Sequence, residues 1–196
     1  MQNFLQKMVF WRKKREDLPD EKIAAILQSL LPLCEKENEY GGWINRATGE
    51  IVELMEGEKK TVPLVPSDRE YRAKGEQGLS SFHTHRRQYP EGSWGNYLHP
   101  TQPSNGDYLH ALAINAPAWV ITLREIYVIK PSKRVSLREI DQWGKKIKKV
   151  QQELQRDDAL PDGFPVETAG FPTRYTPLPP SDCDEVPDQE GAEEAQ

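Results

Sequence analysis

His83 and His85 are separated by a single residue, and residues 79–82 before them form a short apolar run that predicts a buried strand. Because side chains at positions i and i+2 of a strand point to the same face, both imidazoles can reach one metal ion without distortion of the backbone. Residues 103–107 then predict the start of a helix, with Ser104 and Asp107 one turn apart near its N-terminus.

Two neutral imidazoles and one carboxylate, with a fourth position left for water, are the ligand set of a catalytic zinc site. His83, His85 and Asp107 are therefore the candidate zinc ligands. The pattern also allows a purely structural interpretation, since Ser-x-x-Asp before a helix is a capping box that needs no chemistry. We interpret His99 and His110 as surface or packing residues rather than further ligands.

A zinc-activated water needs a general base beside it, and five glutamates upstream of the histidines are candidates: Glu35, Glu37, Glu39, Glu50 and Glu53. Glu39 is favoured because it opens a predicted strand and precedes Gly41 and Gly42. Glycines at such positions let a substrate or another backbone come close to a sheet. Spacing alone does not separate this role from that of a charge at the edge of a strand.

The elements that must position these residues follow from the hydrophobic pattern. A helix is predicted from about Pro19, with an apolar stripe that ends before Pro32, where the helix should kink or end. Residues 39–44 and 50–55 predict a hairpin around an Asn/Thr/Gly turn, and residues 61–65 a third strand. Ser67 and Glu70 can cap a short helix before the strand that carries the histidines.

After Asp107 the pattern predicts a helix to Asn115 and then two strands, residues 118–122 and 125–129, which finish the core. Ser136 and Glu139 form a capping box for a last helix, with an apolar stripe on one face and four lysines on a solvated face. From residue 158 onward prolines and acidic residues dominate, and such a segment buries too little apolar surface to offset its ordering entropy. We therefore predict an arm (1–17), one domain (18–157) and a disordered tail (158–196).

Composition narrows the class of protein. The net charge of −5 disfavours nucleic acid as a partner, and the chain has no apolar run long enough for a membrane span. The two cysteines, Cys34 and Cys183, form no disulfide framework and suit a reducing compartment. The N-terminus lacks the apolar core of a secretory signal, so we expect a cytoplasmic location without membrane association.

Three segments together resemble the signature of the JAB/MPN (JAMM) zinc metallopeptidases, in particular prokaryotic-type JAB domains: Glu39-Tyr-Gly-Gly-Trp-Ile, Phe82-His83-Thr84-His85 and Pro103-Ser104-Asn105-Gly106-Asp107. The signature is a glutamate on an early strand, His-Ser/Thr-His and Ser-x-x-Asp, and the resemblance covers about residues 19–131. It implies an α/β fold, an α-β-α layered domain with a central mixed sheet flanked by helices.

By this resemblance zinc (Zn2+) is the cofactor, and His83, His85 and Asp107 are its ligands. Glu39 would act as the general base, and Ser104 would stabilise the oxyanion. The expected activity is hydrolysis of an amide bond in a peptide or a ubiquitin-like protein substrate. The oligomeric state is not predicted.

The gap between His85 and Ser104 departs from the family, since eighteen residues, 86–103, stand where the family has a short connection. This loop, with Tyr89, Trp94 and Tyr97, is interpreted as a lid or a substrate-binding loop that could also plug the cleft.

Two alternatives stay open at this point. One is an MPN scaffold that binds a partner without catalysis. The other is a cupin-like metal oxygenase, because Gly78, the histidine pair and Glu91 mimic the first cupin motif.

Overall fold

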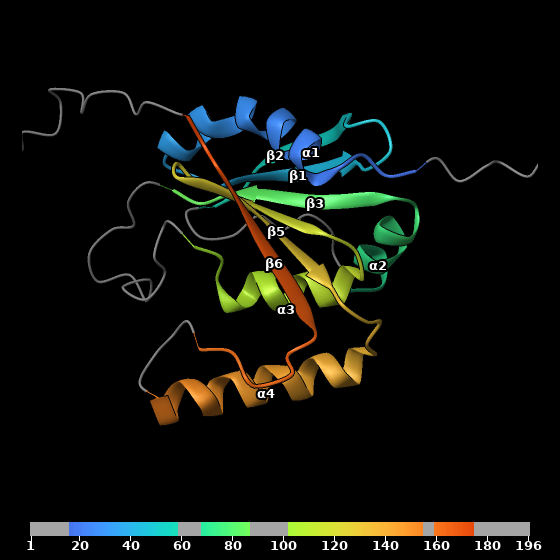
Figure 1. Ribbon diagram of the computed structural model, residues 1–196, viewed down its shortest axis with the longest axis vertical. Coiled ribbons are helices and arrows are strands. Elements are labelled where there is room, and N and C mark those ends of the chain that lie inside the picture. Colours follow the sequence, from blue (N-terminus) through green and yellow to red (C-terminus); the bar gives the residue numbers. More distant parts are fainter. Residues whose placement is uncertain (1–15, 59–67, 87–101, 155–158, 175–196) are drawn as a thin grey trace, which may run out of the picture.

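The computed structural model of the chain describes residues 16–58, 68–86, 102–154 and 159–174. Its centre is a six-stranded mixed sheet in the order β2-β1-β3-β4-β5-β6 (Figure 1). Only β3 and β4 pair in parallel, and every other neighbouring pair is antiparallel. The predicted α/β class, with a central mixed sheet, is confirmed.

The hairpin predicted around the candidate base is present as β1 (Tyr40–Asn45) and β2 (Ile51–Glu56). Its turn is built by the Asn45 side chain, which accepts hydrogen bonds from the backbone N–H groups of Ala47 and Thr48. Gly49 closes the turn at φ 73°, a left-handed conformation that glycine adopts without steric cost. β1 then pairs with β3 (Leu79–Thr84), the strand that delivers the histidines.

The chain passes from β3 to its parallel neighbour β4 (Ala118–Ile121) through α3 (Asn105–Ile114). The predicted strand and helix boundaries agree with these elements to within a few residues. β5 (Glu125–Pro131) follows β4 as an antiparallel neighbour.

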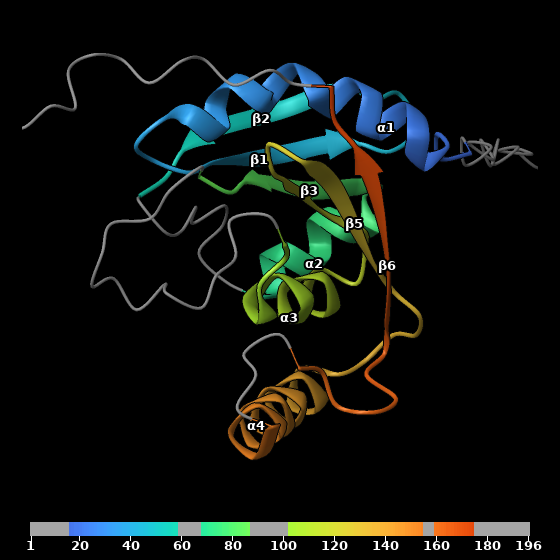
Figure 2. The same cartoon turned by 60° about the vertical axis from the view of Figure 1, so that its left-hand side comes forward.

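Helices cover both faces of the sheet (Figure 2). α1 (Asp20–Leu27) and the 3-10 helix η1 (Gln28–Glu35) pack on one face, where Phe82 and Trp119 join their apolar residues. α2 (Asp68–Glu76) and α3 pack on the other face, where Trp43 and Val120 point. A single sheet between two helical layers differs from the double-sheet barrel of a cupin, so that alternative loses its structural basis.

α4 (Leu137–Leu154) packs outside α3 and forms a further layer, away from the sheet. Its predicted capping box is present, because Glu139 accepts hydrogen bonds from the Ser136 backbone and hydroxyl at 2.7 and 2.8 Å. The four lysines of α4 are exposed, as predicted for a solvated face. Within the described ranges, every helix is too short or too polar to cross a membrane.

Pro32 neither ends nor directly kinks the first helix, so this prediction is wrong in detail. The α-helix changes to 3-10 geometry at Gln28, and the 3-10 helix continues past Pro32 to Glu35. The fixed φ of proline, near −65°, lies within the range of a 3-10 helix, so the ring fits there.

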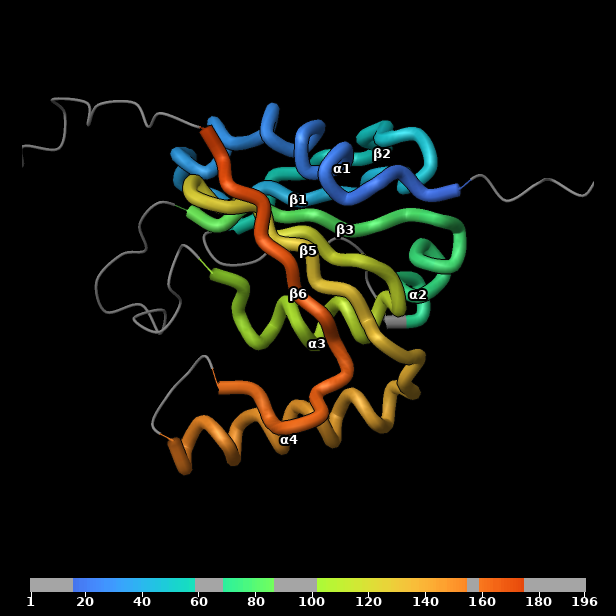
Figure 3. Tube along the Cα trace, viewed as in Figure 1, coloured from blue at the N-terminus to red at the C-terminus, as the bar shows by residue number. Residues whose placement is uncertain are grey.

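The prediction of a disordered tail from residue 158 is wrong for residues 159–174. β6 (Val166–Pro172) pairs antiparallel with the whole of β5 and extends the sheet (Figure 3). Phe171 packs near Trp119 with ring centroids 6.2 Å apart, and Phe164 meets Trp143 edge-on at 5.4 Å. This segment is ordered because its backbone pairs with β5 and because Phe164 and Phe171 pack on the domain. Its composition alone had indicated too little apolar surface to fold.

Several predictions lie outside the described residues: the strand at 61–65, the Ser67 cap, most of the arm 1–17, and residues 175–196 of the tail.

Candidate metal centre

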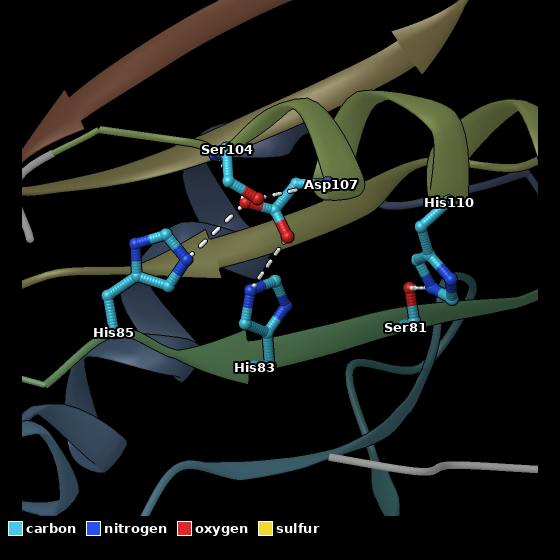
Figure 4. Close-up of polar contacts among 6 residues, drawn as sticks. All are labelled: Ser81, His83, His85, Ser104, Asp107 and His110. Carbon is cyan, nitrogen blue, oxygen red and sulfur yellow. Dashed lines mark hydrogen bonds and ion pairs between the residues drawn. The ribbon is translucent and has the colours of Figure 1, made fainter. Parts of the chain in front are cut away.

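His83, His85 and Asp107 come together at one point between β3 and α3 (Figure 4). Nε2 of His83 lies 3.0 Å from Oδ1 of Asp107, and Nε2 of His85 lies 3.4 Å from Oδ2. One donor atom from each residue lies within 4.8 Å of the others. The three candidate ligands therefore converge, although Asp107 lies 22 positions after the second histidine in the sequence.

β3 positions the two imidazoles. His83 pairs with Gly41 of β1 on one side and with Val120 of β4 on the other. The backbone N–H of His85 donates to Ile121 at 2.8 Å, so the pairing with β4 continues past the end of the strand. Both histidines lie on the α3 face of the sheet, and His85 is only 3% exposed.

The capping box positions the carboxylate. Oδ2 of Asp107 accepts a hydrogen bond from the Ser104 backbone at 2.5 Å, and the Ser104 hydroxyl accepts one from the Asp107 backbone at 3.4 Å. Asp107 is 8% exposed and uses its other oxygen on His83. The structural and the functional interpretations of Ser-x-x-Asp are thus compatible, because the same cap aims the carboxylate at the imidazoles.

The charges at this site shift the pKa values of Asp107 and His83. Burial raises the pKa of Asp107, but the nearby His83 and His85 outweigh it and hold that pKa well below its ordinary value. Burial lowers the pKa of His83, but the Asp107 carboxylate, and then Glu39, outweigh it, so the pKa of His83 is raised. The surroundings of His83 thus favour a positive charge, which a proton or a metal ion could supply.

The donor set fits zinc. Zinc binds imidazole nitrogen and carboxylate oxygen at about 2.0–2.2 Å in tetrahedral geometry, which places neighbouring ligand atoms about 3.4 Å apart. His83 and His85 approach different oxygens of Asp107, at 3.0 and 3.4 Å, and one ligand atom from each residue lies within 4.8 Å of the others, so the three side chains need only a small adjustment to share one ion. Within the described part of the chain, no fourth side chain of a metal-binding type joins the group. Three protein ligands are typical of catalytic rather than structural zinc sites.

Glu39 lies beside this centre. It stands two residues before Gly41, the direct partner of His83, and its backbone continues the hairpin through hydrogen bonds with Gly57 and Glu58. The Thr84 hydroxyl accepts a hydrogen bond from the Tyr40 backbone at 2.9 Å and ties this end of β1 to β3. Glu39 is 5% exposed, and its charge contributes to the raised pKa of His83.

The other candidate bases differ from Glu39 in their surroundings. Glu53 forms an ion pair with Lys74 at 2.6 Å, Glu37 and Glu50 are exposed, and Glu35 is half-buried at the end of η1. Glu39 thus combines burial with an electrostatic effect on a candidate ligand, as the sequence interpretation favoured.

One polar pair at the same interface was missed. The Ser81 hydroxyl and Nε2 of His110 lie within hydrogen-bonding distance, 2.8 Å, and His110 meets Tyr71 edge-on. The signal was present in the spacing, because Ser81 lies two residues before His83 on β3 and His110 three residues after Asp107 on α3. The predictions for Tyr89, Trp94, Tyr97 and His99 fall outside the described residues.

Comparisons with protein-family models, with curated proteins and with solved structures give no match to this chain. The chemistry of the site is therefore the main basis for a functional conclusion.

Proposed function

We propose that the chain is a zinc-dependent peptidase or isopeptidase of the JAB/MPN type, with His83, His85 and Asp107 as the zinc ligands. The observation that carries this proposal is the convergence of two imidazoles and one carboxylate next to a buried glutamate. A metal site needs only the two imidazoles and the carboxylate of Asp107, whereas hydrolysis also needs the glutamate.

Zinc bound there would lower the pKa of a water molecule toward about 7 and polarise the carbonyl under attack. Glu39 would be the residue that takes the proton of such a water and returns it to the amine as the C–N bond breaks. Three observations support this role: Glu39 is buried, its charge acts on His83, and the neighbouring Tyr40 backbone is tied to Thr84 of β3.

Ser104 would donate a hydrogen bond to the oxyanion that develops on the carbonyl under attack. Its oxygen already accepts from the Asp107 backbone, which leaves the hydroxyl hydrogen for another acceptor. Ser104 also stands at the N-cap of α3, and the positive end of the helix dipole favours negative charge there. The cap would thus contribute both a donor and a favourable field.

The substrate class rests on the resemblance alone: a peptide, or an isopeptide conjugate of a ubiquitin-like protein. Cleavage of a fluorogenic peptide and of such a conjugate by the zinc-loaded protein is the direct assay. Loss of the base by Glu39→Gln should reduce the rate by about 10²–10⁴-fold, because the amide is nearly isosteric but cannot accept the proton. Zinc content should stay unchanged.

Glu37→Gln is the matched control, since Glu37 is exposed and only two residues away. It should leave the rate unchanged. Full activity of Glu39→Gln would show that the base is another residue. A wild-type protein that holds zinc but cleaves neither substrate would overturn the proposed activity in favour of a binding scaffold.

A further inference from the structure

A second polar contact joins β3 and α3, about one helical turn along α3 from the metal centre. The Ser81 hydroxyl and Nε2 of His110 are 2.8 Å apart. Ser81 precedes His83 by two residues on the same face of the strand, and His110 follows Asp107 by one helical turn. Figure 4 shows the two contacts side by side along the same strand and helix.

His110 is held in place from a third element. Tyr71 of α2 meets the His110 ring edge-on, with centroids 4.9 Å apart and planes at 88°. Tyr71 in turn packs near Trp43 of β1 at 6.0 Å. The imidazole is therefore fixed between helix and sheet, and the pair connects α3 to the same strand that carries the histidine ligands.

The pair is unsuited to be a second catalytic centre. Ser81 is only 2% exposed, so a substrate carbonyl has no access to its hydroxyl. Burial, and then the charge of His83, lower the pKa of His110 to about 4, so the ring is neutral at physiological pH. A buried neutral Ser–His hydrogen bond holds two elements together without adding charge next to the ligands.

We propose that Ser81 and His110 are positioning residues, which fix α3 on β3 in the register that brings Asp107 to His83 and so set the affinity for zinc. This inference rests on the metal site of the proposed function. α3 is also held by apolar packing through Ala111 and Ile114, but packing of small and branched side chains fixes its register less sharply than directional hydrogen bonds, and Asp107 supplies those at only one point along β3. A second contact one turn along the helix fixes both its rotation and its translation, because a slide by one residue breaks both.

The test is zinc affinity, measured by competition with a chromophoric chelator, together with the unfolding temperature of the zinc-free protein. His110→Phe keeps an aromatic ring for Tyr71 but removes the nitrogen. It should weaken zinc binding by about 10–100-fold, the range found when residues that orient metal ligands are changed. Ser81→Ala should have a similar effect, and His110→Gln, which keeps a hydrogen-bonding group, should restore part of the affinity.

Arg72→Met is the matched control. Arg72 of α2 also tethers α3, but at its other end, where the guanidinium donates to the Ala113 carbonyl at 3.3 Å and to Val135 at 2.9 Å. Its loss should lower the unfolding temperature without changing zinc affinity. This contrast separates positioning from general stability.

Equal zinc affinity of His110→Phe, Ser81→Ala and wild type would overturn the inference and leave the proposed function untouched. The inference would also be overturned if Arg72→Met weakened zinc binding as much as His110→Phe does. Any loss of a contact to α3 would then lower the zinc affinity, whether or not it lies near Asp107. A wild-type protein that binds zinc but hydrolyses nothing would overturn the function alone.

Discussion

The two faces of the sheet differ in chemistry although the same strands build both. Toward α1 and η1 most buried side chains are apolar, with Phe82 and Trp119 among the largest, and the polar residues that β3 places there are the small Ser80 and Thr84. Toward α3 the buried set includes Ser81, His85 and Asp107. Neighbouring residues of β3 thus belong to different environments, because successive side chains of a strand point to opposite faces.

Burial of polar groups costs free energy unless they are paired. On the α3 face the pairing is provided by the contacts of Asp107 with the two histidines and by the Ser81–His110 hydrogen bond. The α1 face thus holds the larger of the two apolar clusters, whereas the α3 face combines a smaller apolar cluster with paired polar groups. The predictions below test this division of roles.

The largest effect should come from removal of β6, which completes the α1 face through Phe171. A chain truncated after residue 157 loses all pairing along one edge of β5 and exposes Trp119. We expect it to lose its cooperative unfolding transition or to unfold at least about 10 °C lower. Truncation after residue 174 is the control and should change the unfolding temperature little, because the removed segment contains few apolar residues.

Phe82→Ala should come next. Phe82 is fully buried on the α1 face and immediately precedes His83. Loss of the ring should lower the free energy of unfolding by about 3–5 kcal/mol in chemical denaturation, through lost transfer energy and a cavity. The folded protein should still bind one zinc ion. Loss of zinc binding by well-folded Phe82→Ala would show that the two faces are not independent.

Much of the fold was predictable because its elements carry local signals. A cluster of turn residues between two short runs marked the β1–β2 hairpin, and capping boxes marked the starts of α3 and α4. β6 was not predicted, because only Val166, Ala169 and Phe171 are apolar in it. The strand depends on pairing with β5, a partner that no local sequence pattern reveals.

The candidate site was predictable for a different reason. His83 and His85 are two positions apart at the end of β3, but their approach to Asp107 depends on how α3 crosses the sheet. The resemblance to the JAB/MPN signature supplied that link in advance. The Ser81–His110 pair was not predicted, because neither residue belongs to the signature and each alone is typical of ordinary packing.

A smaller effect, specific to the α3 face, should appear in the pH dependence. The pKa of His83 is raised above 6.5 in the zinc-free protein, so its interaction with Asp107 stabilises the fold below that pH and fades as the pH rises through the raised value. Zinc must displace this proton, so zinc binding strengthens as the pH rises. Below the raised pKa of His83 the change approaches about 1.4 kcal/mol per pH unit.

The measurement is the difference in unfolding temperature between zinc-saturated and zinc-free protein. It should be larger at about pH 8 than at about pH 6, because the ligands then bind fewer competing protons. If zinc raised the unfolding temperature by the same amount at both pH values, zinc would not be competing with protons for the ligands.

The most direct test of the central claim is the zinc stoichiometry of the purified chain, determined by elemental analysis after zinc loading and gel filtration. We predict one zinc per chain for wild type and none for His83→Ala or Asp107→Ala, with Glu39→Gln as a control that retains the metal. Wild type without zinc, or both ligand variants with a full equivalent, would contradict the assignment of this centre.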